Sequence, residues 1–120
     1  MRRILVVDDE AELRNVLTEF LAKACIAEVQ QAASGDEAML LLQGGATPKL
    51  LVTDLRMPGM SGLDLIRRAK AAHPALRVLA ITGEMEDQRA LARDAGADEV
   101  LRKPFDFKAL EVVALRLLSE

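Results

Sequence analysis

The sequence predicts an α/β domain in which a parallel sheet is covered by helices on both faces. Two observations carry this prediction. Short aliphatic runs alternate with amphipathic helical segments along the chain, and at least one run, residues 50–52, is apolar on both faces, which is typical of a strand buried inside a parallel sheet. Strands connected through helices require a parallel sheet with helices on both sides. We find no linker, low-complexity segment or internal repeat, so we expect residues 1–120 to form one domain.

The N-terminal part contains two strand–helix units. Residues 3–7 form a compact aliphatic strand that ends in carboxylates, and apolar residues at the spacing of one helical face predict a helix over 11–24. The next strand, 26–32, is more polar, which favours the edge of the sheet. Ser34 opens a helix that extends to residue 42 and stops at a pair of glycines.

The central part starts with the most apolar strand, residues 50–53. A tight loop rich in proline and glycine follows, and Ser61 is the expected cap of a helix over 63–72 that ends before Pro74. The alternation then continues to the end of the chain, in the strands 77–81 and 97–101 and the helices 87–94 and 106–118.

Composition limits the classes of protein that fit. Hydrophobic residues make up 51% and charged residues 29%, as in soluble globular proteins, and no apolar run is long enough to cross a membrane. A net charge of -3 and an aromatic content of 2% argue against a nucleic-acid-binding surface. We find no signal peptide, and the single cysteine, Cys25, fits the reducing cytosol, so we expect a cytoplasmic protein.

Polar residues gather where the predicted strands end. Asp8 and Asp9 follow the first strand, Asp54 the third, Thr82 the fourth and Lys103 the fifth. Parallel strands bring these positions to one edge of the sheet, where open α/β folds bind their ligands. Two carboxylates about 4 Å apart repel by about 4 kcal/mol at an effective dielectric of 20, which a bound cation would relieve.

Magnesium is the cation that suits this set, because the ligands are oxygens and the cysteine and histidine ligands of zinc are missing. With Mg²⁺ bound, Asp54 can attack a phosphoryl donor and form an acyl phosphate. Lys103 can neutralise phosphate oxygens, and Thr82 can donate a hydrogen bond to one of them. An alternative is that Asp8 or Asp9 caps the first helix and binds no metal.

Four motifs resemble the response-regulator receiver domains of two-component signalling, in order and spacing across essentially the whole chain. They are VVDDE at 6–10, TDLRMPGMSG at 53–62, AITGE at 80–84 and LRKPF at 101–105. The resemblance implies a flavodoxin-like, doubly wound five-stranded sheet in the order 2-1-3-4-5. It also implies a cis peptide bond between Lys103 and Pro104.

The resemblance further implies a role for each site residue. Asp54 would accept the phosphoryl group, Thr82 would be the switch hydroxyl, and Lys103 would contact the phosphoryl group. Asp8, Asp9, Asp54 and the backbone carbonyl of Arg56 would hold Mg²⁺. The donor would be a sensor histidine kinase or a phosphotransfer protein, and the output a downstream domain or protein.

Two features are peculiar to this chain, one at Val100 and one at the pair of Arg56 and Glu84. Val100 stands where the family commonly has a tyrosine or phenylalanine, which puts the usual aromatic switch in doubt and favours output through the loop after Thr82 and helix 87–94. Arg56 and Glu84 each lie two residues beyond a site residue, and their opposite charges could pair over the site and slow hydrolysis of the phosphoryl group.

Other interpretations remain. The receiver could be a phosphorelay intermediate with little switching, or part of a larger regulator or hybrid kinase, and it could dimerise on phosphorylation. A flavodoxin-like cofactor protein would need a phosphate-cradling loop and aromatic flavin contacts. A phosphatase with an aspartyl nucleophile would need an acid where Arg56 stands.

Overall fold

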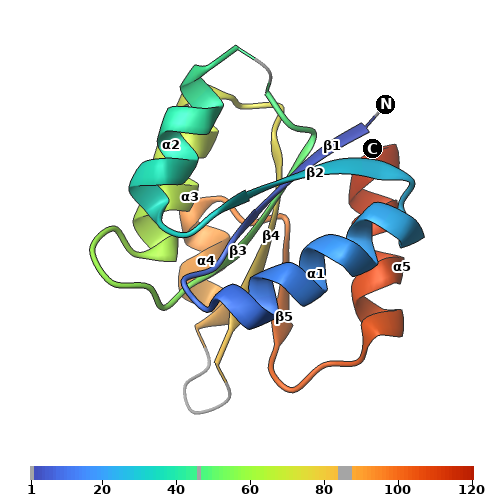
Figure 1. Cartoon of the computed structure of the whole chain (residues 1–120). Coiled ribbons are helices and arrows are strands. Elements are labelled where there is room, and N and C mark those ends of the chain that lie inside the picture. The colour runs from blue at the N-terminus through green and yellow to red at the C-terminus, as the bar shows by residue number, and fades with distance from the viewer. Residues whose placement is uncertain (1, 46, 84–87) are drawn as a thin grey trace.

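The computed structural model describes residues 2–45, 47–83 and 88–120 of the chain. Five parallel strands form one sheet in the order β2-β1-β3-β4-β5, with helices on both faces (Figure 1). This is the predicted flavodoxin-like order. The strands are β1 (Arg2–Val7), β2 (Ala27–Ala32), β3 (Leu50–Asp54), β4 (Arg77–Thr82) and β5 (Glu99–Arg102). The helices are α1 (Ala11–Ala24), α2 (Gly35–Gln43), α3 (Gly62–Ala72), α4 (Arg89–Ala95) and α5 (Phe107–Ser119).

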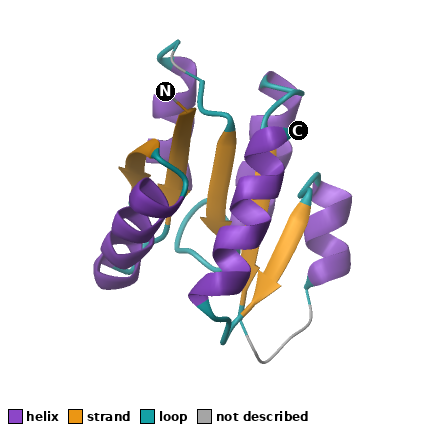
Figure 2. Cartoon of the chain, turned by 90° about the vertical axis from the view of Figure 1, so that its right-hand side faces the viewer, coloured by secondary structure: helices purple, strands orange, loops and turns teal. Residues whose placement is uncertain are grey.

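Both faces of the sheet are apolar, and each is covered by its own helices (Figures 1 and 2). Along β1, Leu5 and Val7 pack with α2, α3 and α4, whereas Ile4 and Val6 pack with α1 and α5. Figure 2 shows the C-terminal helix α5 lying on one face of the sheet, roughly along the strands. This arrangement explains why the buried middle of each central strand (residues 4–7, 50–52 and 78–81) is apolar on both faces, since helices shield both faces from water.

Most element boundaries agree with the sequence prediction, and the differences have local causes. β2 is an edge strand, as expected, but it begins one residue late because Ile26 takes a left-handed backbone conformation with φ 48°. β5 begins at Glu99 and not at 97, because the Ala97 amide donates back to the Ala92 carbonyl and ends α4. The predicted start of the fourth helix, residue 87, lies outside the described residues.

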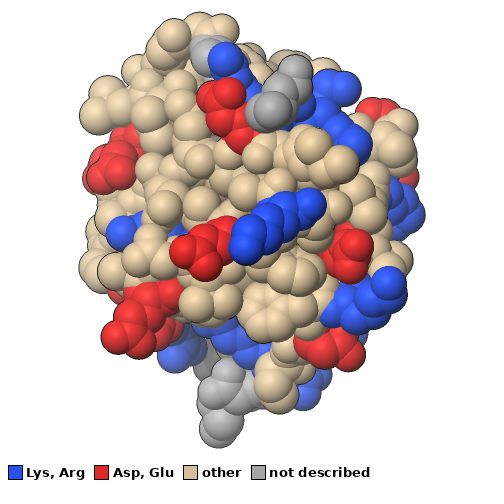
Figure 3. All heavy atoms as spheres, turned by 45° about the vertical axis from the view of Figure 1, so that its right-hand side comes forward, with Lys and Arg blue, Asp and Glu red and all other residues tan. Residues whose placement is uncertain are grey.

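The surface carries both signs of charge. On the face shown in Figure 3, acidic and basic side chains are interspersed and form no extended basic patch. None of the helices in the described part of the chain is both long enough and apolar enough to span a membrane. Cys25, the C-cap residue of α1, is buried in the core that α1 and α5 cover.

Candidate functional site

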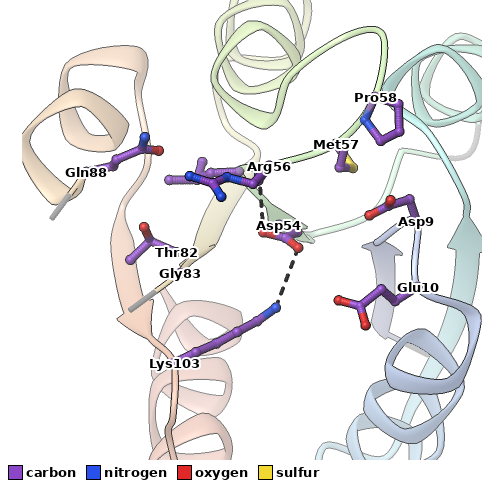
Figure 4. Close-up of a pocket in the computed structure, with 11 residues that line it drawn as sticks. Asp9, Glu10, Asp54, Arg56, Met57, Pro58, Thr82, Gly83, Gln88 and Lys103 are labelled. Atoms are coloured by element: carbon purple, nitrogen blue, oxygen red, sulfur yellow. Dashed lines mark hydrogen bonds and ion pairs between the residues drawn. The ribbon is translucent and has the colours of Figure 1, made fainter. Parts of the chain in front are cut away.

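A pocket of about 590 Å³ lies at the carboxyl edge of the sheet, where polar residues stand at the ends of the strands (Figure 4). Four loops contribute to it, those after β1, β3, β4 and β5. The lining residues are Asp9, Glu10, Asp54, Leu55, Arg56, Met57, Pro58, Thr82, Gly83, Gln88 and Lys103. The pocket therefore brings together residues that lie up to 94 positions apart in the sequence, from 9 to 103.

Asp54 lies at the centre of this pocket, at the end of the fully buried strand β3. Its side chain keeps only 8% of its surface exposed. The Arg56 amide donates a hydrogen bond of 3.2 Å to Oδ1, and the Lys103 ammonium lies 3.6 Å from Oδ2. The carboxylate is thus held by one hydrogen bond and one ion pair while its remaining surface faces the pocket.

The backbone of Asp54 is fixed by the start of α3. A β-carbon on Gly62 would lie 2.2 Å from the Asp54 carbonyl oxygen and 2.6 Å from the Cα of Leu55, so only glycine permits this approach. The Gly62 amide donates to the Leu55 carbonyl at 3.0 Å, and Ser61 caps the helix as predicted, by accepting from the Asp64 amide. The helix therefore sets the position from which Asp54 enters the pocket.

An acidic cluster lies beside Asp54. Asp8, Glu10 and Asp54 each place one carboxylate oxygen within 4.8 Å of the others. Asp8 is buried, its Oδ1 accepts from the Glu10 amide at 2.9 Å, and its Oδ2 has no hydrogen-bond partner among the described residues. Burial raises the pKa of Asp8, the Glu10 amide lowers it, and the nearby Asp54 carboxylate raises it further.

This donor set fits a hard divalent cation. The carboxylates supply oxygen ligands, and the buried Oδ2 of Asp8 has no hydrogen-bond partner within residues 2–45, 47–83 and 88–120. The cluster could therefore hold a metal ion, and a cation there would offset both the repulsion between the carboxylates and the burial of Asp8.

Comparison with known proteins identifies the family. A family model described as "Response regulator receiver domain" matches residues 4–114. The chain belongs to the response regulator receiver family. This settles the fold and the signalling class that the motifs predicted, and it makes a flavodoxin-like cofactor protein the weaker interpretation.

Two relatives show the range of this receiver's family. The DNA-binding transcriptional regulator NtrC of Salmonella typhimurium is 39% identical over 117 residues, which are 97% of this chain but 24% of NtrC. The chemotaxis protein CheY1 of Helicobacter pylori is 32% identical over 91% of this chain and 90% of its own length. The receiver thus spans about a quarter of NtrC and nearly all of CheY1.

Solved structures agree with the fold of this receiver. The receiver domain of NtrX from Brucella abortus superposes with a TM-score of 0.89 at 33% identity, covering 97% of this chain and 98% of that one. A response regulator receiver domain protein from Clostridium thermocellum gives a TM-score of 0.90 at 30% identity, covering 99% and 95%.

The receiver's predicted site residues meet at the carboxyl edge of the sheet, but the acidic cluster contains Glu10 in place of Asp9. Asp9 lines the pocket, but it is Glu10 whose carboxylate groups with those of Asp8 and Asp54. Glu10 belongs to the acidic run after β1, so the sequence contained this signal. Neither Asp8 nor Asp9 caps the first helix, because Glu10 is the N-cap residue of α1 and makes no side-chain cap bond.

Thr82 and Lys103 reach the pocket from neighbouring strands. Thr82 is buried at the end of β4, and the Lys103 amide donates to its carbonyl at 2.9 Å. The peptide bond between Lys103 and Pro104 is cis, as the resemblance implies. Figure 4 shows the Lys103 side chain directed toward Asp54, and the Arg56 side chain extending from its loop toward Gln88 and Thr82.

Three further positions complete the comparison with the sequence. Gln88, the N-cap residue of α4, lines the pocket, and no sequence motif pointed to it. Glu84, the proposed partner of Arg56, lies outside the described residues. Val100 is buried in the core that α2, α3 and α4 cover, opposite Ala80 of β4.

Proposed function

We propose that Asp54 of this receiver accepts a phosphoryl group in a Mg²⁺-dependent reaction. The observation that carries the proposal is the position of the Asp54 carboxylate, 3.6 Å from the Lys103 ammonium and grouped with the carboxylates of Asp8 and Glu10 in an open pocket. The donor would be the phosphohistidine of a sensor histidine kinase or phosphotransfer protein. An Asp54 oxygen attacks phosphorus, the bond to the histidine nitrogen breaks, and an acyl phosphate remains on Asp54.

The roles of the other residues follow from their positions. Asp8, Asp9, Asp54 and the backbone carbonyl of Arg56 would hold Mg²⁺, and Glu10 joins this set because its carboxylate lies in the cluster. Bound Mg²⁺ would supply charge neutralisation for the carboxylates and the incoming phosphate. Lys103 would pair with a phosphoryl oxygen, and the Thr82 hydroxyl would donate a hydrogen bond to another.

The receiver would act as a phosphoacceptor that gains and loses its phosphoryl group, and not as an enzyme with turnover on a free substrate. Its output would be a change in binding to a downstream domain or protein in the cytoplasm. NtrC relatives are named as DNA-binding regulators, but this chain covers 24% of their length, and its interspersed charges and net charge of -3 do not favour direct contact with nucleic acid.

A relay role without a strong switch is the second candidate, and Val100 favours it. Val100 has no ring that could turn inward when Thr82 moves, and it already lies buried in the core. Unchanged spectra of β4, β5, α4 and α5 on phosphorylation would support a relay. Shifts in α4 would support output through that helix.

Intact mass after incubation with acetyl phosphate, with and without Mg²⁺, tests the phosphoacceptor proposal on the wild type and on Asp54→Asn. We expect one phosphoryl adduct that requires Mg²⁺ and is absent from the variant. A Mg²⁺ titration then separates the remaining outcomes. Mg²⁺ binding without an adduct indicates a receiver that needs its own kinase. The absence of both Mg²⁺ binding and the adduct would contradict the proposal.

A further inference from the structure

We propose that Arg14, supported by Gln31, is a positioning residue for the cation site. It would fix the peptide that follows Asp8 and so keep the Asp8 carboxylate grouped with those of Glu10 and Asp54. This inference rests on the proposed Mg²⁺-dependent function and deepens it. Arg14 lies on α1, lines no part of the pocket and belongs to none of the four motifs.

The contacts of Asp8 carry the first step. Its amide donates to the Ala32 carbonyl of β2 at 3.2 Å, its carbonyl accepts from Nη1 of Arg14 at 2.7 Å, and its Oδ1 accepts from the Glu10 amide at 2.9 Å. Within the described part of the chain only Oδ2 is left bare, and it is buried. Every other polar atom of Asp8 is therefore fixed, and the one atom that is free is a carboxylate oxygen suited to a cation.

The contacts of Arg14 carry the second step. Its Nε donates to the side-chain oxygen of Gln31 in β2 at 3.0 Å, and its own amide donates to the Glu10 carbonyl at 2.9 Å in the first turn of α1. The side chain thus joins the start of α1, the end of β2 and the end of β1. A guanidinium can hold two acceptors in a fixed planar geometry, which an ammonium cannot do.

The bond from Arg14 to the Asp8 carbonyl matters most before a cation binds, because the neighbouring carboxylates then repel one another. Asp8, Glu10 and Asp54 repel one another, and the loop after β1 would relax by turning carboxylates away from the pocket. The bond from Arg14 to the Asp8 carbonyl opposes that motion because it fixes the peptide that follows Asp8. Ligands held in place by outer partners bind a metal more tightly than ligands that must first be ordered.

Titration calorimetry with MgCl₂ on the folded protein measures the effect directly. We expect Arg14→Met to weaken Mg²⁺ binding about tenfold, as loss of outer-shell partners commonly does. Arg14→Lys should recover part of the affinity, because an ammonium can still donate to the Asp8 carbonyl. Gln31→Met should weaken binding about threefold, since it removes one neutral partner of the guanidinium.

Arg67→Met is the matched control. Arg67 also makes a side-chain hydrogen bond from a helix, to Asp64 at 3.1 Å, but this pair is exposed on α3 and lines no part of the pocket. Its Mg²⁺ affinity should equal that of the wild type. Amide spectra add a second readout, because the Mg²⁺-induced shifts of Asp8 and Glu10 should persist in Arg67→Met and shrink in Arg14→Met.

A purely structural role for Arg14 gives a different result. In that case Arg14→Met would lower the melting temperature and leave the Mg²⁺ dissociation constant within twofold of the wild type, which overturns the inference. If Arg14→Met does not fold, Arg14→Lys and Gln31→Met decide by the same criterion. A wild type that neither binds Mg²⁺ nor forms the adduct overturns the proposed function instead.

Discussion

Arg116 of α5 donates a hydrogen bond of 2.6 Å to Oε2 of Glu99 in β5. Glu99 also pairs with Arg93 of α4 at 3.4 Å, so one carboxylate joins three neighbouring elements. The Arg116 hydrogen bond is the main reason why the pKa of Glu99 lies below its usual value of 4.5, with burial opposing it. The pair therefore links the sheet edge to both helices beside it.

This arrangement predicts a pH-dependent loss of stability in Glu99→Gln. Because the pKa of Glu99 is lower in the folded state, its contribution is complete above the unfolded pKa and disappears as the pH falls through the folded pKa. We expect the variant to lose about 0.5–1 kcal/mol of unfolding free energy at pH 7, the range for partly exposed pairs, and less at pH 3. Urea unfolding at the two pH values measures this, and equal losses at both would contradict it.

Removing the Asp8 carboxylate should have opposite effects without and with metal. Its raised pKa means that the ionised form is disfavoured in the folded state, so stability falls as the pH rises through that value. Without metal at pH 7, we expect Asp8→Asn to be more stable than the wild type by about 1 kcal/mol.

Added Mg²⁺ should reverse the order of the Asp8 variant and the wild type. Millimolar Mg²⁺ should raise the melting temperature of the wild type but not that of Asp8→Asn, because binding to the folded state alone stabilises it. Asp64→Asn, an exposed change on α3, should respond like the wild type. An unchanged Mg²⁺ response in Asp8→Asn would remove Asp8 from the proposed metal ligands.

Ile26 offers a stabilising substitution. Its backbone has φ 48°, a conformation that is costly for a β-branched residue, and its side chain is 74% exposed, so little packing is lost on removing it. We expect Ile26→Gly to gain about 0.5–1 kcal/mol, the strain relief less the added freedom of the unfolded chain. Thermal melts against Ile26→Ala, which keeps a β-carbon at this φ, separate the backbone effect from loss of the side chain. An Ile26→Gly variant less stable than the wild type would contradict the expected gain.

Gly62 should be intolerant of even one methyl group. Its β-carbon would lie 2.2 Å from the Asp54 carbonyl oxygen, so α3 must move away from β3. We expect Gly62→Ala to cost about 2–3 kcal/mol by urea unfolding, as forced overpacking does. Gly59→Ala is the comparison. The φ of Gly59 is 74°, and a β-carbon added there would have no described atom within 4 Å apart from its chain neighbours, so this variant isolates conformational strain and should cost about 1 kcal/mol. Equal losses in both variants would argue against the steric reason.

The alternation of strands and helices and the residues at the carboxyl edge were predictable because both follow from local patterns, whereas the strand order was implied by the resemblance to receiver domains. The sequence alone places Asp54, Thr82 and Lys103 together, since each ends a recognisable apolar run. Gln88 and Arg14 could not be predicted, because their positions depend on how α4 and α1 pack on the sheet. The choice between Asp9 and Glu10 depends on the direction of side chains in a turn, which spacing alone does not determine.

The pocket draws on four strand ends, and its last component, Lys103, comes 49 positions after Asp54 in the sequence. On a ribosome, a nascent chain with β1 and β3 paired would expose Asp54 while Lys103 was still missing. Competence to receive a signal would then arise only when β5 joins the sheet. Under the proposed function, a copy in which β5 has not yet joined the sheet would lack the Lys103 ammonium beside Asp54 and would accept a phosphoryl group poorly.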